Sequence, residues 1–135
     1  MSKPLRFVLA VVAALVTWAV VATLLNFILR AAIPGYRAEE IAMSFSLGSQ
    51  IARLALALLS TAAAAIVACI VSRGILAAAV ASGCLLLAMF IPVHVSLWTK
   101  FPAWYHLFFL ASLPVGSYAF ARLWAARRSP APPAS

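Results

Sequence analysis

The sequence predicts an all-α integral membrane protein, a bundle of four transmembrane helices with a helical extension before the second span. Two observations predict this class. First, hydrophobic residues make up 67% of the 135 residues and charged residues only 9%, whereas soluble domains contain roughly 25% charged residues. Second, the charged residues stand mainly at the edges of long apolar runs. This composition argues against a soluble enzyme, a DNA-binding module and a disordered chain.

Four apolar runs without Asp, Glu, Lys or Arg are expected to span the bilayer, because each approaches the ~20 residues that a spanning helix needs. Their approximate bounds are 7–29, 54–72, 75–93 and 103–121. The first run is longer than the ~7–15-residue apolar core of a signal peptide, so we expect it to remain as a membrane anchor. Only Arg73 and Gly74 separate the second run from the third, which predicts a tight antiparallel turn.

The segments outside the spans are predicted to differ in structure. Residues 1–128 are expected to form a single membrane domain, whereas residues 129–135 read Ser-Pro-Ala-Pro-Pro-Ala-Ser, which predicts a disordered tail. The sequence permits one continuous helix over residues 38–72. At ~1.5 Å per residue this helix would be ~50 Å long, more than the ~30 Å hydrocarbon layer. Either this helix is therefore strongly tilted, or its first part lies outside the membrane or along the interface.

The basic residues predict the orientation of the chain. With four spans, both termini and the turn at Arg73 lie on one side. That side carries Lys3, Arg6, Arg73, Arg122, Arg127 and Arg128, and the other carries Arg30, Arg37, Arg53 and Lys100. Because cytoplasmic loops are richer in Lys and Arg, we expect both termini in the cytoplasm of a bacterium and the chain in the inner membrane.

Polar residues suited to a ligand site fall on the side opposite the termini. Both glutamates and both histidines of the chain lie there. The candidate ligand-binding residues are Arg37, Glu39, Glu40, Arg53, His94, Lys100 and His106. Arginine and lysine bind phosphate and carboxylate groups, and Trp98 and Trp104 in the same region suit the membrane interface. This pattern predicts contact with the bilayer and with an anionic lipid head group.

Arg53 has two interpretations. If the second span begins near Leu54, the Arg53 side chain reaches the interface and acts as an anchor. If the span begins near Ala42, Arg53 lies inside the membrane, where an ionisable residue is costly and usually functional. The sequence leaves both interpretations open.

No recognisable set of catalytic or metal-binding residues is present. A metal or a haem at His94 and His106 is conceivable, but their spacing matches no standard motif, and we predict no metal and no cofactor. The chain contains no aspartate, so a Ser-His-Asp set is excluded. No span contains an acidic residue, which argues against the proton-coupled antiport of small multidrug resistance transporters, which depend on a glutamate in their first span.

Two functional hypotheses remain. Small residues recur at intervals of four in the second and third spans, a spacing that lets membrane helices pack closely. They are Ser60, Ala64, Ala68 and Ser72, and Ala79 and Gly83. This favours a non-enzymatic accessory or assembly subunit of a membrane complex, or a homo-oligomer. The alternative is a carrier or transport component for a lipid or lipid-linked ligand, with its site on the non-cytoplasmic face. No nucleic-acid partner is expected, because the basic residues do not form one charged face.

Overall fold

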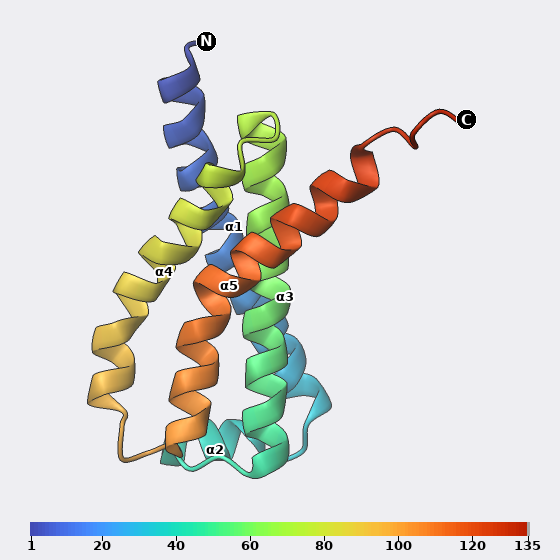
Figure 1. Ribbon diagram of the computed structural model, residues 1–135. Coiled ribbons are helices and arrows are strands. Elements are labelled where there is room, and N and C mark those ends of the chain that lie inside the picture. The colour runs from blue at the N-terminus through green and yellow to red at the C-terminus, as the bar shows by residue number, and fades with distance from the viewer. Residues whose placement is uncertain (135) are drawn as a thin grey trace.

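The computed structural model describes residues 1–134, which form four long helices and one short helix (Figure 1). The long helices are α1 (Lys3–Ala32), α3 (Leu47–Ser72), α4 (Leu76–Ser96) and α5 (Ala103–Arg128), and the short helix α2 (Tyr36–Ala42) lies between α1 and α3. Each long helix has the length and the apolar composition needed to cross a membrane. The predicted class, an all-α chain with four candidate membrane spans, is confirmed.

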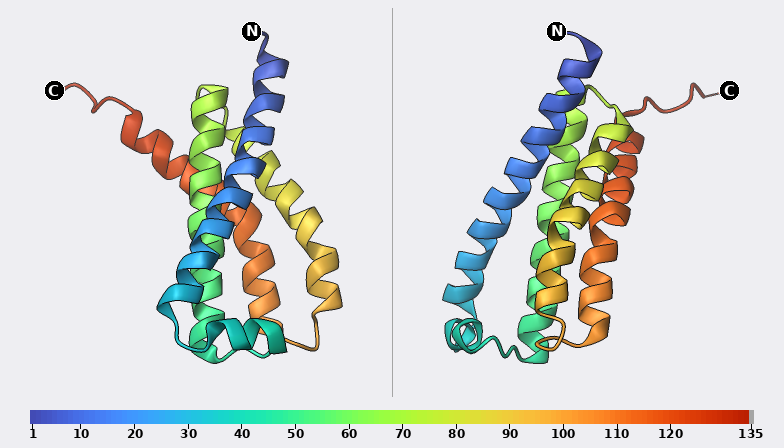
Figure 2. Two further views of the ribbon diagram at one scale, coloured as in Figure 1. Left: turned by 180° about the vertical axis from the view of Figure 1, so that it is seen from behind. Right: turned by 90° about the vertical axis from the view of Figure 1, so that its left-hand side faces the viewer.

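The four long helices alternate in direction along the bundle. Both termini and the α3–α4 turn lie at one end, and α2 and the α4–α5 loop lie at the other (Figure 1). Helix α3 is central, because it packs against α1, α4 and α5. Helices α1 and α4 cross near the end that holds the termini and diverge toward the opposite end (Figure 2). Their contact includes Ala10 and Val11 of α1 and Ala78 of α4.

The turn between α3 and α4 has the expected form. Arg73 and Gly74 both adopt left-handed backbone conformations, with φ of 59° and 89°. The amide of Gly74 donates to the carbonyl oxygen of Cys69 at 2.7 Å, which satisfies a carbonyl group at the end of α3. The predicted tight turn is therefore confirmed.

The predicted helical extension before the second span is confirmed as the separate helix α2, and the continuous helix that the sequence permits over residues 38–72 is not formed. The chain leaves α2 at Met43, whose φ is 51°. Helix α3 then begins after Ser46, whose hydroxyl oxygen accepts from the amide of Ser49 at 3.3 Å. Oε2 of Glu39 accepts from the amide of Ser46 at 3.3 Å. The serine cap and the glutamate together stabilise a helix start at this point, and α2 lies across the end of the bundle (Figure 2).

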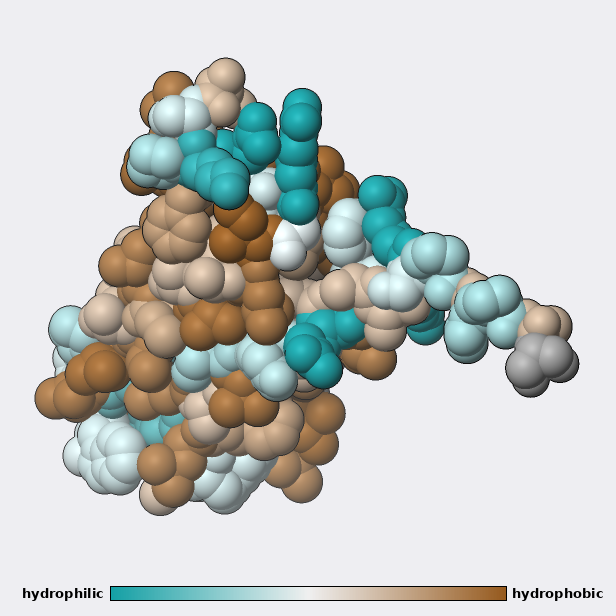
Figure 3. All heavy atoms as spheres, turned by 45° about the horizontal axis from the view of Figure 1, so that its top comes forward, coloured by the Kyte–Doolittle hydropathy of each residue, from teal (hydrophilic) through white to brown (hydrophobic). Residues whose placement is uncertain are grey.

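The bundle buries small residues and exposes large apolar ones. Ser60, Ala64, Ala68, Ser72 and Ala79 are all at most 1% exposed. The outer faces of the helices carry exposed apolar side chains such as Val16, Leu24 and Leu59. Hydrophilic side chains gather around the end that holds the termini, while the sides are largely apolar (Figure 3). Close packing of small residues inside and apolar residues outside is the arrangement expected of helices in lipid.

Helix α5 continues beyond the predicted span, to Arg128. Residues 129–134 follow as an exposed segment without helix or strand. The disordered state of the tail stays a prediction, and Ser135 lies outside the described residues.

Candidate functional site: an amphipathic cavity between diverging helices

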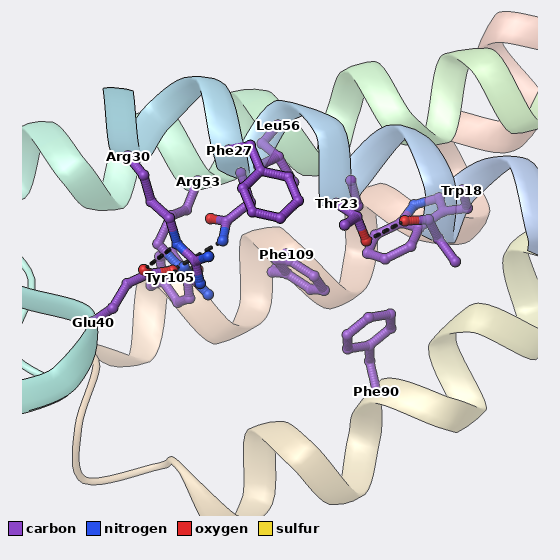
Figure 4. Close-up of a pocket in the computed structure, with 13 residues that line it drawn as sticks. Trp18, Thr23, Phe27, Arg30, Glu40, Arg53, Leu56, Phe90, Tyr105 and Phe109 are labelled. Atoms are coloured by element: carbon purple, nitrogen blue, oxygen red, sulfur yellow. Dashed lines mark hydrogen bonds and ion pairs between the residues drawn. The ribbon is translucent and has the colours of Figure 1, made fainter. Parts of the chain in front are cut away.

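A cavity of about 460 Å³ lies where α1 and α4 diverge, with α3 and α5 forming its inner wall. Its volume falls within the ~300–1,000 Å³ typical of small-molecule sites. The lining residues come from all five helices. They are Trp18, Ala19, Ala22, Thr23, Asn26, Phe27, Arg30, Glu40, Arg53, Leu56, Phe90, Tyr105 and Phe109. Charged and polar groups gather at one end and aromatic side chains at the other (Figure 4).

Arg53 is at the centre of the polar end. Its Nη1 donates to the phenolic oxygen of Tyr36 at 2.9 Å, and its Nε donates to the phenolic oxygen of Tyr105 at 3.3 Å. Its guanidinium carbon lies 4.6 Å from the centre of the Phe45 ring, close enough for a cation–π contact. Within residues 1–134, no carboxylate lies within ion-pair distance of Arg53. The guanidinium is therefore held inside the bundle by neutral partners.

Glu40 connects α2 to α1 beside Arg53. Its Oε2 accepts from Nε of Arg30 at 2.7 Å, and its Oε1 accepts from Nδ2 of Asn26 at 3.0 Å. Burial acts to raise the pKa of Glu40, but the hydrogen bonds from Arg30 and Asn26 outweigh it and hold that pKa below its usual value. The hydroxyl of Tyr36 donates to Oδ1 of Asn26 at 3.0 Å. Burial raises the pKa of Tyr36, so its hydroxyl keeps the proton that this hydrogen bond requires.

The other end of the cavity is apolar and aromatic. The rings of Trp18 and Phe90 lie 4.9 Å apart between centroids, and those of Phe90 and Phe109 lie 5.2 Å apart. Nε1 of Trp18 donates to Oγ1 of Thr61 at 3.1 Å, which joins α1 to α3 and fixes the indole. This end therefore presents an aromatic wall to an apolar group.

A buried histidine pair lies behind the cavity wall. Nδ1 of His94 and Nδ1 of His106 are 2.7 Å apart, and Nε2 of His106 lies 3.3 Å from the carbonyl oxygen of Trp98. The ring of His94 stacks on Tyr105 and also contacts Phe109, and both of these residues line the cavity. The pair is thus one side chain away from the site.

The structure separates the seven predicted site residues into three groups. Glu40 and Arg53 line the cavity. His94 and His106 contact each other beside it. Arg37, Glu39 and Lys100 do not line the cavity; Arg37 and Lys100 are exposed, and Glu39 is engaged with Ser46.

Sequence reasoning missed most of the α1 side of the cavity. Trp18, Ala22, Asn26 and Arg30 line it from four positions spaced by four residues, which places them on one helical face. Tyr36 and Tyr105 were also missed as partners of Arg53. The sequence did contain an indication of this face. Asn26 is a polar residue inside the first apolar run, and it lies four residues before Arg30, which ends that run.

The chemistry of the site suits an anion better than a metal. The Nδ1 atoms of His94 and His106 are hydrogen-bonded to each other at 2.7 Å, so neither is free to bind a metal. No group of three or more His, Cys, Asp or Glu side chains that could hold a metal is present in residues 1–134. The polar end contains two guanidinium groups and one carboxylate, which leaves one positive charge without an opposite partner.

Comparison with known proteins adds no relative. No protein-family model, no curated protein and no solved structure matches this chain. The residues of the cavity are therefore the basis for a functional proposal.

Proposed function

We propose that this protein is a membrane-embedded carrier or transport component that binds an amphiphile with an anionic head group, a lipid or a lipid-linked ligand. The observation that carries the proposal is Arg53. Its guanidinium lines the cavity and is hydrogen-bonded only to two tyrosine hydroxyl groups among the described side chains. A phosphate or carboxylate at this position would complete a charge-assisted contact.

The charge balance of the cavity supports an anionic ligand. Glu40 pairs with Arg30 in the one ion pair within residues 1–134. The positive charge of Arg53 is therefore not paired with a carboxylate. Holding an unpaired charge away from water is costly. An unpaired guanidinium contributes little to the stability of the fold. In a binding site it is useful, because an anionic ligand supplies the missing opposite charge.

The distribution of side chains along the cavity supports an elongated, amphipathic ligand. On α1, Trp18 is eight residues from Asn26 and twelve from Arg30, or ~12 Å and ~18 Å at ~1.5 Å per residue. A head group at Arg53 therefore leaves an apolar body lying along Leu56 and toward Phe90 (Figure 4).

The position of the cavity suggests how such a ligand enters. Because residues of α1 and α4 line the cavity and these helices diverge toward the end that carries α2 (Figure 2), we expect an acyl or prenyl chain to enter from the bilayer between them. On the orientation predicted from the basic residues, the polar end of the cavity lies on the non-cytoplasmic side.

The structure weakens the reason for preferring an accessory or assembly subunit. That hypothesis relied on two stripes of small residues, from Ser60 to Ser72 and from Ala79 to Gly83. These side chains pack inside the chain itself, so they offer no surface to a partner. An assembly role consequently has no residue-level support comparable to that of the cavity.

The proposal is tested by lipid binding in phosphatidylcholine nanodiscs, measured by native mass spectrometry. Lysophosphatidylglycerol is the anionic probe, and zwitterionic lysophosphatidylcholine is the comparison. We expect the wild type to retain the anionic probe preferentially and Arg53→Gln to lose this preference. Arg37→Gln is the matched control, because it removes a positive charge from the same end at an exposed residue outside the cavity. Equal retention of the two probes by the wild type would refute the proposal.

A further inference from the structure

We propose that His94 and His106 form a proton-binding site coupled to the anion site at Arg53, so that the protein takes up one proton together with its anionic ligand. This inference rests on the proposed function, because the coupling requires an anion in the cavity. His94 and His106 do not line the cavity, and their proposed role is to bind a proton rather than the ligand.

The contacts of the pair determine where its hydrogens lie. The partner of His106 Nε2 is the carbonyl oxygen of Trp98, which accepts but cannot donate. His106 Nε2 therefore carries a hydrogen, and in the neutral ring His106 Nδ1 is a lone pair. It follows that His94 Nδ1 donates to His106 Nδ1 across the 2.7 Å contact, which leaves a lone pair on His94 Nε2.

This arrangement holds one additional proton without losing a hydrogen bond. A proton from water adds to the lone pair of His94 Nε2, and His94 becomes an imidazolium with hydrogens on both nitrogens. The Nδ1–H···Nδ1 bond to His106 is kept and becomes charge-assisted, which strengthens it. A second proton would have to occupy His106 Nδ1 and would break that bond. The pair is thus built to bind a single proton, with His106 0% and His94 6% exposed.

The pair is connected to the anion site through Tyr105. The His94 ring stacks on the Tyr105 ring, with centroids 6.2 Å apart and planes 24° apart, and the Tyr105 hydroxyl oxygen accepts from Nε of Arg53. The titratable and charged groups that face the pair are therefore Tyr105 of α5 and Arg53 of α3, with Glu40 beyond Arg53. Lys100, in the adjoining loop, is exposed.

The coupling follows from the signs of the charges. Before an anion binds, the unpaired charge on Arg53 opposes a second positive charge on His94. An anion at Arg53 cancels that charge and favours protonation of the pair. By thermodynamic reciprocity, protonation of the pair must then increase the affinity for the anion by the same factor.

The chain contains only two histidines, so ¹⁵N-histidine labelling reports on this pair alone. The experiment is an NMR pH titration of the wild type in phosphatidylcholine nanodiscs, with and without lysophosphatidylglycerol. The phosphodiester of this probe keeps its charge from pH 5.5 to 8. We expect the probe to raise the titration midpoint of the pair by ~0.7–2 pH units, which corresponds to the ~5–150-fold coupling usual between two sites.

Binding measurements on variants give a second test. The wild type should bind the anionic probe more tightly at pH 5.5 than at pH 8, by a factor that stays below the full coupling of ~5–150-fold, and His94→Gln should remove most of this dependence. Lys100→Gln is the control and should keep it. Probe binding that depends on Arg53 but not on pH, with an unchanged histidine midpoint, would overturn the proton coupling and leave the anion site standing. Absence of any preference for the anionic probe would instead overturn the proposed function.

Discussion

The phenolic oxygen of Tyr36 lies 2.9 Å from Nη1 of Arg53, seventeen residues later in the chain. The same hydroxyl donates to Oδ1 of Asn26, so one fully buried tyrosine joins α1, α2 and α3. A helix of seven residues is too short to be stable alone. Helix α2 therefore keeps its place through Tyr36 and Glu40, and it in turn fixes the direction of the guanidinium in the cavity.

Replacing Tyr36 with phenylalanine should loosen α2. The substitution removes an acceptor for Arg53 and a donor for Asn26, and a buried group left without its partner costs about 1–3 kcal/mol. Hydrogen exchange of the amides in residues 36–42 should become faster than in the wild type. Tyr118→Phe is the control, because the Tyr118 side chain is exposed on α5. Unchanged exchange in Tyr36→Phe would show that α2 is held by other contacts.

Acidification should release α2 through Glu40. The pKa of this carboxyl is lower in the folded chain than in the unfolded one, so its contribution to stability is complete above the unfolded value of ~4.3. That contribution is lost as the pH falls through the folded pKa, because the protonated carboxyl no longer pairs with Arg30. We expect the exchange protection of residues 36–42 to decrease below about pH 4. In Glu40→Gln protection should be lower at neutral pH, and this pH dependence should be weaker, with the contribution of Glu39 remaining.

Gly83 should be intolerant of a side chain. A Cβ atom at Gly83 would lie 2.5 Å from Oγ of Ser117 and 2.7 Å from the carbonyl oxygen of Leu113, so α4 and α5 would have to separate. Gly83→Ala is expected to lower the free energy of unfolding by about 1–3 kcal/mol, as measured by denaturant titration in bicelles. Gly48→Ala is the control, since a Cβ there meets nothing within 4 Å. Equal stability of the two variants would contradict the close α4–α5 contact.

The spans could be predicted because the bilayer imposes a simple requirement on sequence. Apolar runs of sufficient length, bounded by Arg and Lys, identified the four long helices with errors confined to their ends. The break at Met43 could not be predicted in this way, because a non-glycine residue with positive φ is uncommon and nothing local to Met43 demands it. It results from Ser46 and Glu39 acting together.

The cavity was harder to predict because it depends on how helices cross. Arg53 was identified from its charge, but its partners Tyr36 and Tyr105 are brought to it by the position of α2 and by the α3–α5 contact. Trp18 and Phe90 meet across α1 and α4, which no sequence spacing relates. His94 and His106 were identified only as candidate site residues, whereas Arg37 and Lys100 show that sharing one end of the bundle does not place a residue in its cavity.

Filling the apolar part of the cavity should block binding without changing any charge. Ala22 lines the cavity on the same α1 face as Asn26 and Trp18, and Ala22→Phe would place a ring where the ligand's chain is proposed to lie. Each buried methylene of the ligand contributes ~0.8 kcal/mol, so displacing a few of them should weaken binding of lysophosphatidylglycerol in nanodiscs by about tenfold or more. Ala55→Phe is the matched control, because Ala55 is exposed on α3 and does not line the cavity. Because Arg53 is retained, a residual preference of Ala22→Phe for the anionic over the zwitterionic probe is expected, whereas undiminished affinity would mean that the chain of the ligand lies elsewhere.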